Sequence, residues 1–254
     1  MITISPGHWV PGTGASDLID EVAEARKVVK RVVKILRANK ITTNHVVDNS
    51  SKNQSQNLKY LVNEHNLTSR ELDVSVHFNS SSRTDRGLGV EVLYFSIKDL
   101  AAKMSKAISE VSGLINRGAK LRKDLAFLNS TNKPAILIEV CFVCSTADIA
   151  IYKRDFEKIC YAIAQCLAEF VGKPIKKGGS KLDFSSKAMQ TKYEMRTSSP
   201  ATKKLILETA FSIEELHLDR KHWEEQYEKG NIKEGDWNAF AYEVAVHLAK
   251  NKYK

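Results

Sequence analysis

The feature that most constrains the fold is an almost uninterrupted apolar run over residues 135–143. A short run of this kind, rich in Ile and Val, is typical of a β-strand that is buried on both faces. Such a strand requires helices above and below its sheet, and segments with helical periodicity alternate with β-rich segments through residue 171. The pattern therefore predicts an α/β domain with a twisted, largely parallel sheet and helices on both faces.

The individual elements follow from the spacing of the apolar residues. Residues 21–39 repeat apolar side chains every three or four positions, which predicts an amphipathic helix. Residues 72–79 alternate apolar with other side chains, which predicts a strand with one buried face. The same reasoning predicts further helices and strands: helices at residues 53–65, 97–115 and 155–171, and strands at residues 1–8, 41–48 and 89–95.

A change in composition after residue 171 divides the chain. Residues 172–182 are rich in Gly, Pro and Lys, which is typical of a flexible linker. We therefore predict a larger domain over residues 1–171 and a small, mainly helical domain over residues 183–254. The helices expected in the smaller domain cover residues 200–218, 219–230 and 233–250.

The composition excludes some classes of protein. The 254 residues are 43% hydrophobic and 27% charged, which is ordinary for a globular protein, and no apolar run approaches the roughly 18 residues that span a bilayer. We therefore expect no membrane insertion. The first residues lack the basic and apolar regions of a signal peptide, so we expect synthesis in the cytoplasm. The net charge of +9 is spread along the chain, which argues against nucleic acid and fits another polyanion, such as an acidic cell wall.

Three of the predicted strands carry a side chain that can bind a metal. His8 follows the first strand, His77 lies in the alternating strand, and Glu139 lies within the apolar run. In open α/β sheets ligands bind at the carboxyl ends of the strands, so these side chains can converge. Glu21, at the start of the first helix, supplies a fourth. Two imidazoles and one carboxylate are a ligand set of catalytic zinc, and the other carboxylate would then act as a base.

Glu139 suits the role of the base because apolar residues surround it in the sequence. Burial raises the pKa of a carboxyl toward neutrality, where a proton acceptor works best. A buried and unpaired acid costs several kcal/mol, so Glu139 needs a partner or a function. The other residues have simpler alternatives, since a histidine at a strand end often has a structural hydrogen bond and a Glu at a helix start stabilises the helix dipole.

Five segments of the sequence resemble one known family. The zinc-dependent N-acetylmuramoyl-L-alanine amidases of the amidase type 3 family, and their bacteriophage endolysins in particular, have similar motifs in the same order and spacing over about residues 1–171. These segments are Ser5–His8, Ser75–Asn79, Gly89–Tyr94, Asn116–Lys120 and Leu137–Val140.

The resemblance implies a site and an activity. His8, Glu21 and His77 correspond to the zinc ligands, with one zinc ion per domain, and Glu139 corresponds to the catalytic acid and base. Glu24 competes with Glu21 because it lies one turn further along the same helix. The implied reaction is hydrolysis of the amide bond between N-acetylmuramic acid and L-alanine in peptidoglycan of a Gram-positive bacterium, after the membrane has been permeabilised.

Other residues are assigned with alternatives. Asn79, Arg117 and Lys120 are candidates for binding the stem peptide, although the two cations also fit a solvated surface. Trp9 stands where the family has a glycine-rich pattern, and it lines the substrate groove or packs at its rim. The remaining histidines, among them His45 and His65, match no motif and are expected at the surface.

The smaller domain is interpreted by analogy with the two-part layout of endolysins as a cell-wall-binding module. Its aromatic residues, Trp223, Tyr227 and Trp237, either bind wall carbohydrate or form the core of a three-helix domain, and the domain is also a candidate for self-association. Alternatives for the whole protein are a zinc-dependent peptidoglycan peptidase or deacetylase, a mother-cell lysin of a sporulating bacterium, and a basic binding module without activity.

Overall fold

The computed structural model describes residues 1–175, 200–213, 216, 218–232, 237, 240, 241 and 244. The chain divides into two compact units, Met1–Gly178 and Gly179–Lys254, and each is described by itself. Most of the expected linker at residues 172–182 lies outside the described residues, so its boundaries stay a prediction. Among the described residues, no helix is both long and apolar enough to cross a membrane.

The first unit is built on a six-stranded sheet with the order β2-β1-β3-β6-β4-β5. All neighbouring strands are parallel except β4 and β6, which confirms the largely parallel sheet. The exception follows from the connection after β3, because residues 80–89 contain no helix and a parallel return needs a long crossover. The strands are β1 (Ile2–Pro6), β2 (Thr43–His45), β3 (Leu72–Asn79), β4 (Val90–Tyr94), β5 (Asn116–Leu121) and β6 (Ala135–Phe142).

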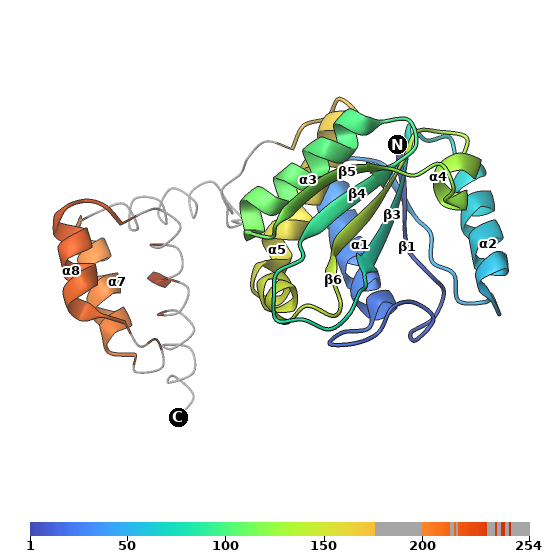
Figure 1. Cartoon of the computed structure of the whole chain (residues 1–254). Coiled ribbons are helices and arrows are strands. Elements are labelled where there is room, and N and C mark those ends of the chain that lie inside the picture. Colours follow the sequence, from blue (N-terminus) through green and yellow to red (C-terminus); the bar gives the residue numbers. More distant parts are fainter. Residues whose placement is uncertain are drawn as a thin grey trace. The chain divides into compact units, whose positions relative to one another are not determined.

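Helices cover both faces of the sheet, as expected. The helices α1, α3 and α5 pack together on one face, and α2 and α4 lie on the other (Figure 1). The first face carries the main hydrophobic core, whereas the second carries a small apolar cluster around Phe127 and Leu137. The helices are α1 (Glu21–Ala38), α2 (Gln54–Asn66), α3 (Lys98–Ser112), α4 (Ala126–Ser130) and α5 (Thr146–Phe170).

The central strand β3 shows how different the two faces are. Val74, Val76 and Phe78 point into the main core, while the alternate residues point to the opposite face of the sheet, where Asp73 contacts His65 on α2. The prediction that β3 has one solvated face is wrong, because Asp73 and Ser75 are 0% and 1% exposed. These polar side chains are buried because they find hydrogen-bond partners inside the protein, as described below.

Four other elements differ from the prediction. Both β5 and α4 were missed, and β5 lacks apolar periodicity because it is the exposed edge of the sheet. The last helix, α5, begins at Thr146 rather than at residue 155, and Asp155 is a non-helical residue inside it. The α3 helix ends at Ser112 because Gly113 adopts a left-handed conformation with φ of 85°.

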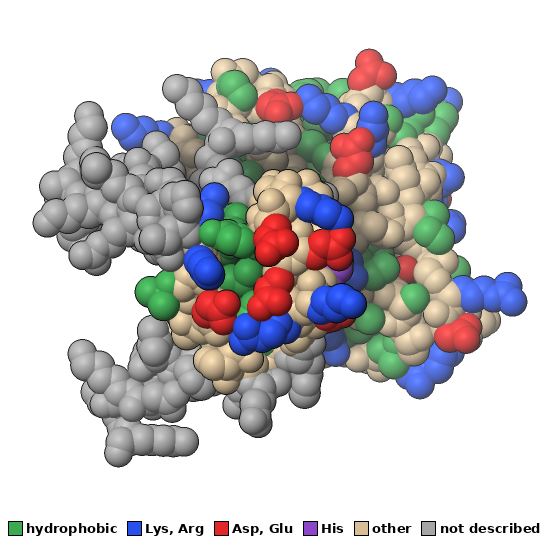
Figure 2. Space-filling view, turned by 90° about the vertical axis from the view of Figure 1, so that its left-hand side faces the viewer, with side chains coloured by type: hydrophobic (Ala, Val, Ile, Leu, Met, Phe, Trp, Pro, Cys, Tyr) green, Lys and Arg blue, Asp and Glu red, His purple; other side chains and the backbone are tan. Residues whose placement is uncertain are grey.

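The second unit contains α7 (Pro200–Phe211) and α8 (Arg220–Glu228). The helix expected at 200–218 therefore ends earlier, and most of the helix expected at 233–250 lies outside the described residues. Trp223, Tyr227 and Trp237 pack partly buried against a small apolar cluster, which is the core role left open by the sequence. Figure 2, which draws both units, shows acidic and basic side chains intermixed on the face toward the viewer. The role of this unit in wall binding or self-association stays a prediction.

Candidate metal centre

His8 lies in the loop between β1 and α1. Its φ of 61° is in the left-handed region, which a residue other than glycine rarely adopts. The surrounding contacts hold it there: the Gly7 amide donates to the Val76 carbonyl at 2.8 Å, and Asn57 Nδ2 donates to the His8 carbonyl at 3.1 Å. The unusual backbone conformation turns the imidazole of His8 toward the start of α1.

Glu21 is the first residue of α1 and is only 3% exposed. The helix start is fixed by Asp20, whose side chain accepts a hydrogen bond from the Ala23 amide at 2.8 Å. Glu21 Oε1 lies 2.9 Å from His77 Nδ1, and Glu21 Oε2 lies 3.2 Å from His8 Nε2. Backbone amides of Phe78 and Ala15 donate to the same two oxygens at 3.2 Å and 2.7 Å.

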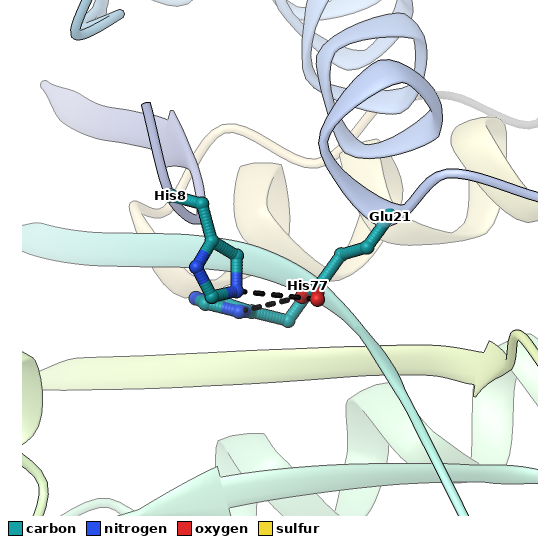
Figure 3. Close-up of side chains that lie close together, drawn as sticks. All are labelled: His8, Glu21 and His77. Atoms are coloured by element: carbon teal, nitrogen blue, oxygen red, sulfur yellow. Dashed lines mark hydrogen bonds and ion pairs between the residues drawn. The ribbon is translucent and has the colours of Figure 1, made fainter. Parts of the chain in front are cut away.

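Three side chains from separate elements therefore meet at one point. His8, Glu21 and His77 each offer a ligand atom, and these atoms all lie within 4.8 Å of one another (Figure 3). Four-coordinate zinc with bonds of about 2.0–2.2 Å places its ligand atoms roughly 3.5 Å apart, so small adjustments would bring the three atoms to that geometry. The donor set and its spacing fit a zinc ion.

Two glycines make room for this cluster. A Cβ atom on Gly7 would lie 2.0 Å from Cε1 of His77, and a Cβ atom on Gly14 would lie 2.6 Å from Oε2 of Glu21. Real Cβ atoms do not approach side chains this closely, so any larger residue would displace a candidate ligand. The requirement for glycine at both positions is therefore set by the candidate ligands themselves.

The charges within the cluster reinforce one another. Burial raises the pKa of Glu21, but the hydrogen bonds from His77 and His8 outweigh this effect and hold the pKa well below its usual range. Burial lowers the pKa of His77, whereas its hydrogen bond to Glu21 and the charge of Glu139 raise it, and the net shift is upward. The lowered pKa of Glu21 keeps its carboxylate ionised, which is the form that binds a cation, whereas the raised pKa of His77 means that its imidazole gives up a proton when a metal binds.

Glu139 lies beside the cluster in a different environment. It is the register partner of His77 on β3 and of Glu91 on β4, so the three side chains form a row across the sheet. Its Oε2 atom is buried and has no hydrogen-bond partner in the part of the chain that the structure describes. Burial, with a smaller contribution from the charges of Glu21 and Glu91, raises the pKa of Glu139 to about 7, against the opposing effect of His77.

A polar cluster continues the row beyond Glu139. Asn79 Nδ2 donates to Glu91 Oε1 at 2.9 Å, and Arg117 Nε donates to Glu91 Oε2 at 2.6 Å. The Arg117 guanidinium also lies 5.0 Å from the centre of the Phe142 ring. Glu91 was missed from the sequence as a site residue, although its position in the motif Gly89–Tyr94 is a signal that could have identified it.

The other candidates occupy less constrained positions. Lys120 is exposed on β5, two residues after Gly118, and Trp9 is partly exposed in the loop after His8. Glu24 lies outside the cluster, because it accepts hydrogen bonds from Lys27 Nζ at 2.6 Å and from the Tyr152 hydroxyl at 2.9 Å. The structure therefore favours Glu21 over Glu24 as the acidic member of the cluster.

The expectation of a surface position is wrong for His65. His65 is completely buried, with Nδ1 2.8 Å from Asp73 Oδ1 and Nε2 3.1 Å from Ser5 Oγ. His45 is partly buried on the edge strand β2. His65 was misjudged because a histidine that matches no motif carries no sequence signal for buried hydrogen-bond partners.

The fold and this site together define a class of protein. The model of the family N-acetylmuramoyl-L-alanine amidase matches residues 2–169, and the chain belongs to this family. An uncharacterized 38.4 kDa protein of Clostridium perfringens is 34% identical over 180 residues, which cover 68% of this chain. The matched region covers 52% of that relative, so the chain spans about half its length.

Solved structures show the same fold. The catalytic domain of the CD27L endolysin targeting Clostridia difficile is 26% identical, with a TM-score of 0.61 over 69% of this chain and 98% of that chain. The catalytic domain of CwlV, an N-acetylmuramoyl-L-alanine amidase from Bacillus (Paenibacillus) polymyxa var. colistinus, is 24% identical, with a TM-score of 0.59 over 68% of this chain and 98% of that chain. The similarity covers the first unit and extends over nearly the whole of both catalytic domains.

Proposed function

We propose that the first unit is a zinc-dependent amidase that cleaves the bond between N-acetylmuramic acid and L-alanine in peptidoglycan. The observation that carries this proposal is the cluster of His8, Glu21 and His77, with Glu139 directly beside it, whose buried Oε2 atom has no hydrogen-bond partner among the described residues. The family of the chain supports the substrate, and the geometry of the cluster supports the metal.

The three ligand side chains would hold the ion and leave one position open. When bound, zinc would polarise the scissile carbonyl and increase the acidity of a water molecule. The protein holds the ligand side chains in place before the ion binds. Glu21 contacts both imidazoles, and backbone amides donate hydrogen bonds to both carboxylate oxygens of Glu21.

Glu139 would transfer the proton. A carboxyl with a pKa of about 7 can accept a proton from the attacking water and then return it to the leaving amine of L-alanine. The free Oε2 atom suits this role, because no hydrogen bond inside the protein competes for it in the absence of substrate. Its register with His77 keeps the proton acceptor next to the metal site.

Asn79 and Arg117 would bind the stem peptide beyond the scissile bond. Glu91 holds both of them, so a substrate carboxylate would meet an oriented guanidinium rather than a freely moving one. Lys120 would add positive charge on the same side of the sheet, and Trp9 would border the other side of the site near His8.

The test is digestion of purified Gram-positive cell wall followed by mass spectrometry of the products. An amidase releases stem peptides that have a free amino group on L-alanine, whereas a peptidase or a deacetylase leaves that bond intact and produces other new amino groups. His77→Ala should lose both zinc, measured by elemental analysis, and wall digestion. Products with an intact bond to L-alanine, or full digestion by His77→Ala, would reject the proposal.

The biological role that we propose is that of an endolysin with a second, wall-binding unit. The similarity of the first unit to an endolysin catalytic domain supports it. Expression of the protein together with a membrane-permeabilising agent should lyse a sensitive Gram-positive host, and expression without the agent should not. A requirement for sporulation instead would point to a mother-cell lysin. A pull-down of the full chain and of a chain ending at residue 178 with intact walls measures the contribution of the second unit.

A further inference from the structure

The imidazole of His77 is held from both sides. Its Nδ1 atom lies 2.9 Å from Glu21 Oε1 inside the candidate metal cluster, and its Nε2 atom lies 3.0 Å from the hydroxyl oxygen of Ser75. Ser75 stands two residues before His77 on β3, so both side chains point to the same face of the sheet. Ser75 is 1% exposed, and its hydroxyl is therefore shielded from water.

This arrangement has a chemical consequence for metal binding. A neutral imidazole carries one proton, and the nitrogen that binds a metal must be the one without it. When Nδ1 binds the ion, Nε2 carries the proton and needs an acceptor, and Ser75 Oγ is at hydrogen-bond distance. Partners of this kind fix the tautomer and the ring orientation of a metal-binding histidine.

We propose that Ser75 is a positioning residue that holds His77 with its proton on Nε2 and thereby makes Nδ1 the metal-binding atom. The inference rests on the proposed metal centre and goes beyond it, because it assigns the binding nitrogen and a residue that does not touch the metal. Without the Ser75 hydroxyl, a buried N–H group would be left without a partner whenever the metal is bound, and metal binding would weaken.

The protein contains a closely matched control in a second serine–histidine pair. Ser5 on β1 is the register partner of Ser75, and its hydroxyl lies 3.1 Å from Nε2 of His65. The other ring nitrogen of His65 faces Asp73 rather than the metal cluster, and Arg70 donates to both oxygens of Asp73 at 2.7 Å.

The hydrogen bonds that link Ser5, His65 and Asp73 connect a hydroxyl, an imidazole and a carboxylate, as in the catalytic triad of serine hydrolases. All three residues are completely buried between α2, which carries His65, and the sheet, so no substrate reaches the hydroxyl, and the pair has a structural role. Ser5 thus matches Ser75 in residue type, burial, strand register and hydrogen-bonded atom, and differs only in which histidine it contacts.

The experiment compares Ser75→Ala with Ser5→Ala in the full chain. The zinc dissociation constant is measured by competition with a chromophoric chelator, and thermal unfolding of the zinc-free proteins reports general damage. We expect Ser75→Ala to weaken zinc binding about 10- to 100-fold and Ser5→Ala to change it less than about threefold. Equal weakening in both variants, or unchanged binding in Ser75→Ala, would overturn the inference.

A second measurement does not depend on the folding of either variant. In zinc-loaded wild-type protein with ¹⁵N-labelled histidine, long-range ¹H–¹⁵N spectra should show His77 with zinc on Nδ1 and a proton on Nε2. Zinc on Nε2 would contradict the inference while leaving the metal centre intact. A wild-type protein that binds no zinc would instead reject the proposed function.

Discussion

The two carboxylates on either side of His77 lie in opposite environments. Glu21 is held by two imidazoles and two backbone amides, and its pKa is lowered, whereas the Oε2 atom of Glu139 has no partner and its pKa is raised to about 7. This difference in hydrogen bonding and pKa allows two glutamates to perform different tasks in the same site. A fully bonded, ionised carboxylate suits a fixed ligand, and an unpaired carboxyl that titrates near neutrality suits proton transfer.

The comparison predicts that replacing each carboxylate abolishes activity for a different reason. Glu139→Gln should keep one zinc ion per protein and lose about 10²- to 10⁴-fold in the rate of wall hydrolysis, because only the proton acceptor is removed. Glu21→Gln should lose activity together with zinc, because a ligand is removed. Steady-state rates and elemental analysis of the same samples separate the two. Retention of zinc by Glu21→Gln, or its loss from Glu139→Gln, would reverse the assignment.

The same two substitutions should change the stability of the zinc-free protein in opposite directions. The folded-state pKa of Glu139 is raised from 4.5 to about 7, so its stabilising contribution is present below pH 4.5 and is lost as the pH rises through 7. A shift of this size corresponds to about 3 kcal/mol at pH 8, which Glu139→Gln should recover. The folded-state pKa of Glu21 is lowered, so its contribution is present at pH 8 and is lost in acid. Glu21→Gln should therefore destabilise the protein at that pH.

Urea unfolding of the wild type and both variants at pH 5 and pH 8 measures these changes. The stabilisation by Glu139→Gln should be larger at pH 8 than at pH 5, and zinc should reduce it, because a nearby cation favours the ionised carboxylate. The same cation would lower the pH below which the zinc-loaded enzyme loses activity. Destabilisation by Glu139→Gln at pH 8 would show that its carboxylate has a partner after all.

The sequence predicted the ligand cluster better than its surroundings. His8, Glu21 and His77 were placed together because strand ends and a helix start converge in an α/β sheet, and the family motifs pointed to the same residues. The contacts of His65 with Ser5 and Asp73 could not be predicted, since they depend on the register of β1 with β3 and on α2 covering that face. Alternation in β3 placed Ser75 and His77 on the same face, but it did not show that the two side chains are hydrogen-bonded. Alternation in β3 predicts a solvated face, because periodicity shows which residues are polar but not whether a helix buries them.

The edge of the sheet was the least predictable part. In β5 the residues are mostly exposed, so the chain needs no apolar pattern there, and Arg117 appeared only as a motif residue. Its anchoring by Glu91 joins β4 to β5 through side chains that lie 26 positions apart in the sequence. The antiparallel pairing of β4 with β6 then brings Glu91 next to Glu139, and only the folded structure contains that adjacency.

A substitution of Glu91 should have the smallest effect of those predicted here, and it tests why the pKa of Glu139 differs from that of Glu21. Its negative charge is one cause of the raised pKa of Glu139, and it also holds the Arg117 guanidinium. Glu91→Gln removes the charge and releases the cation, and both changes favour the ionised form of Glu139. We expect the midpoint of the Glu139 titration in zinc-free protein, followed by ¹³C NMR of the carboxyl carbon, to fall by a fraction of a unit.

A matched control removes the same charge elsewhere. Glu110 is exposed on α3, which covers the other face of the sheet, and it pairs only with Lys106 at 3.7 Å among the described residues. Glu110→Gln should leave the Glu139 midpoint unchanged, and zinc affinity should stay the same in both variants because neither residue contacts the ligands. If Glu91→Gln leaves the midpoint unchanged or raises it, the charge of Glu91 has no part in raising the pKa of Glu139, and burial and the charge of Glu21 account for the shift.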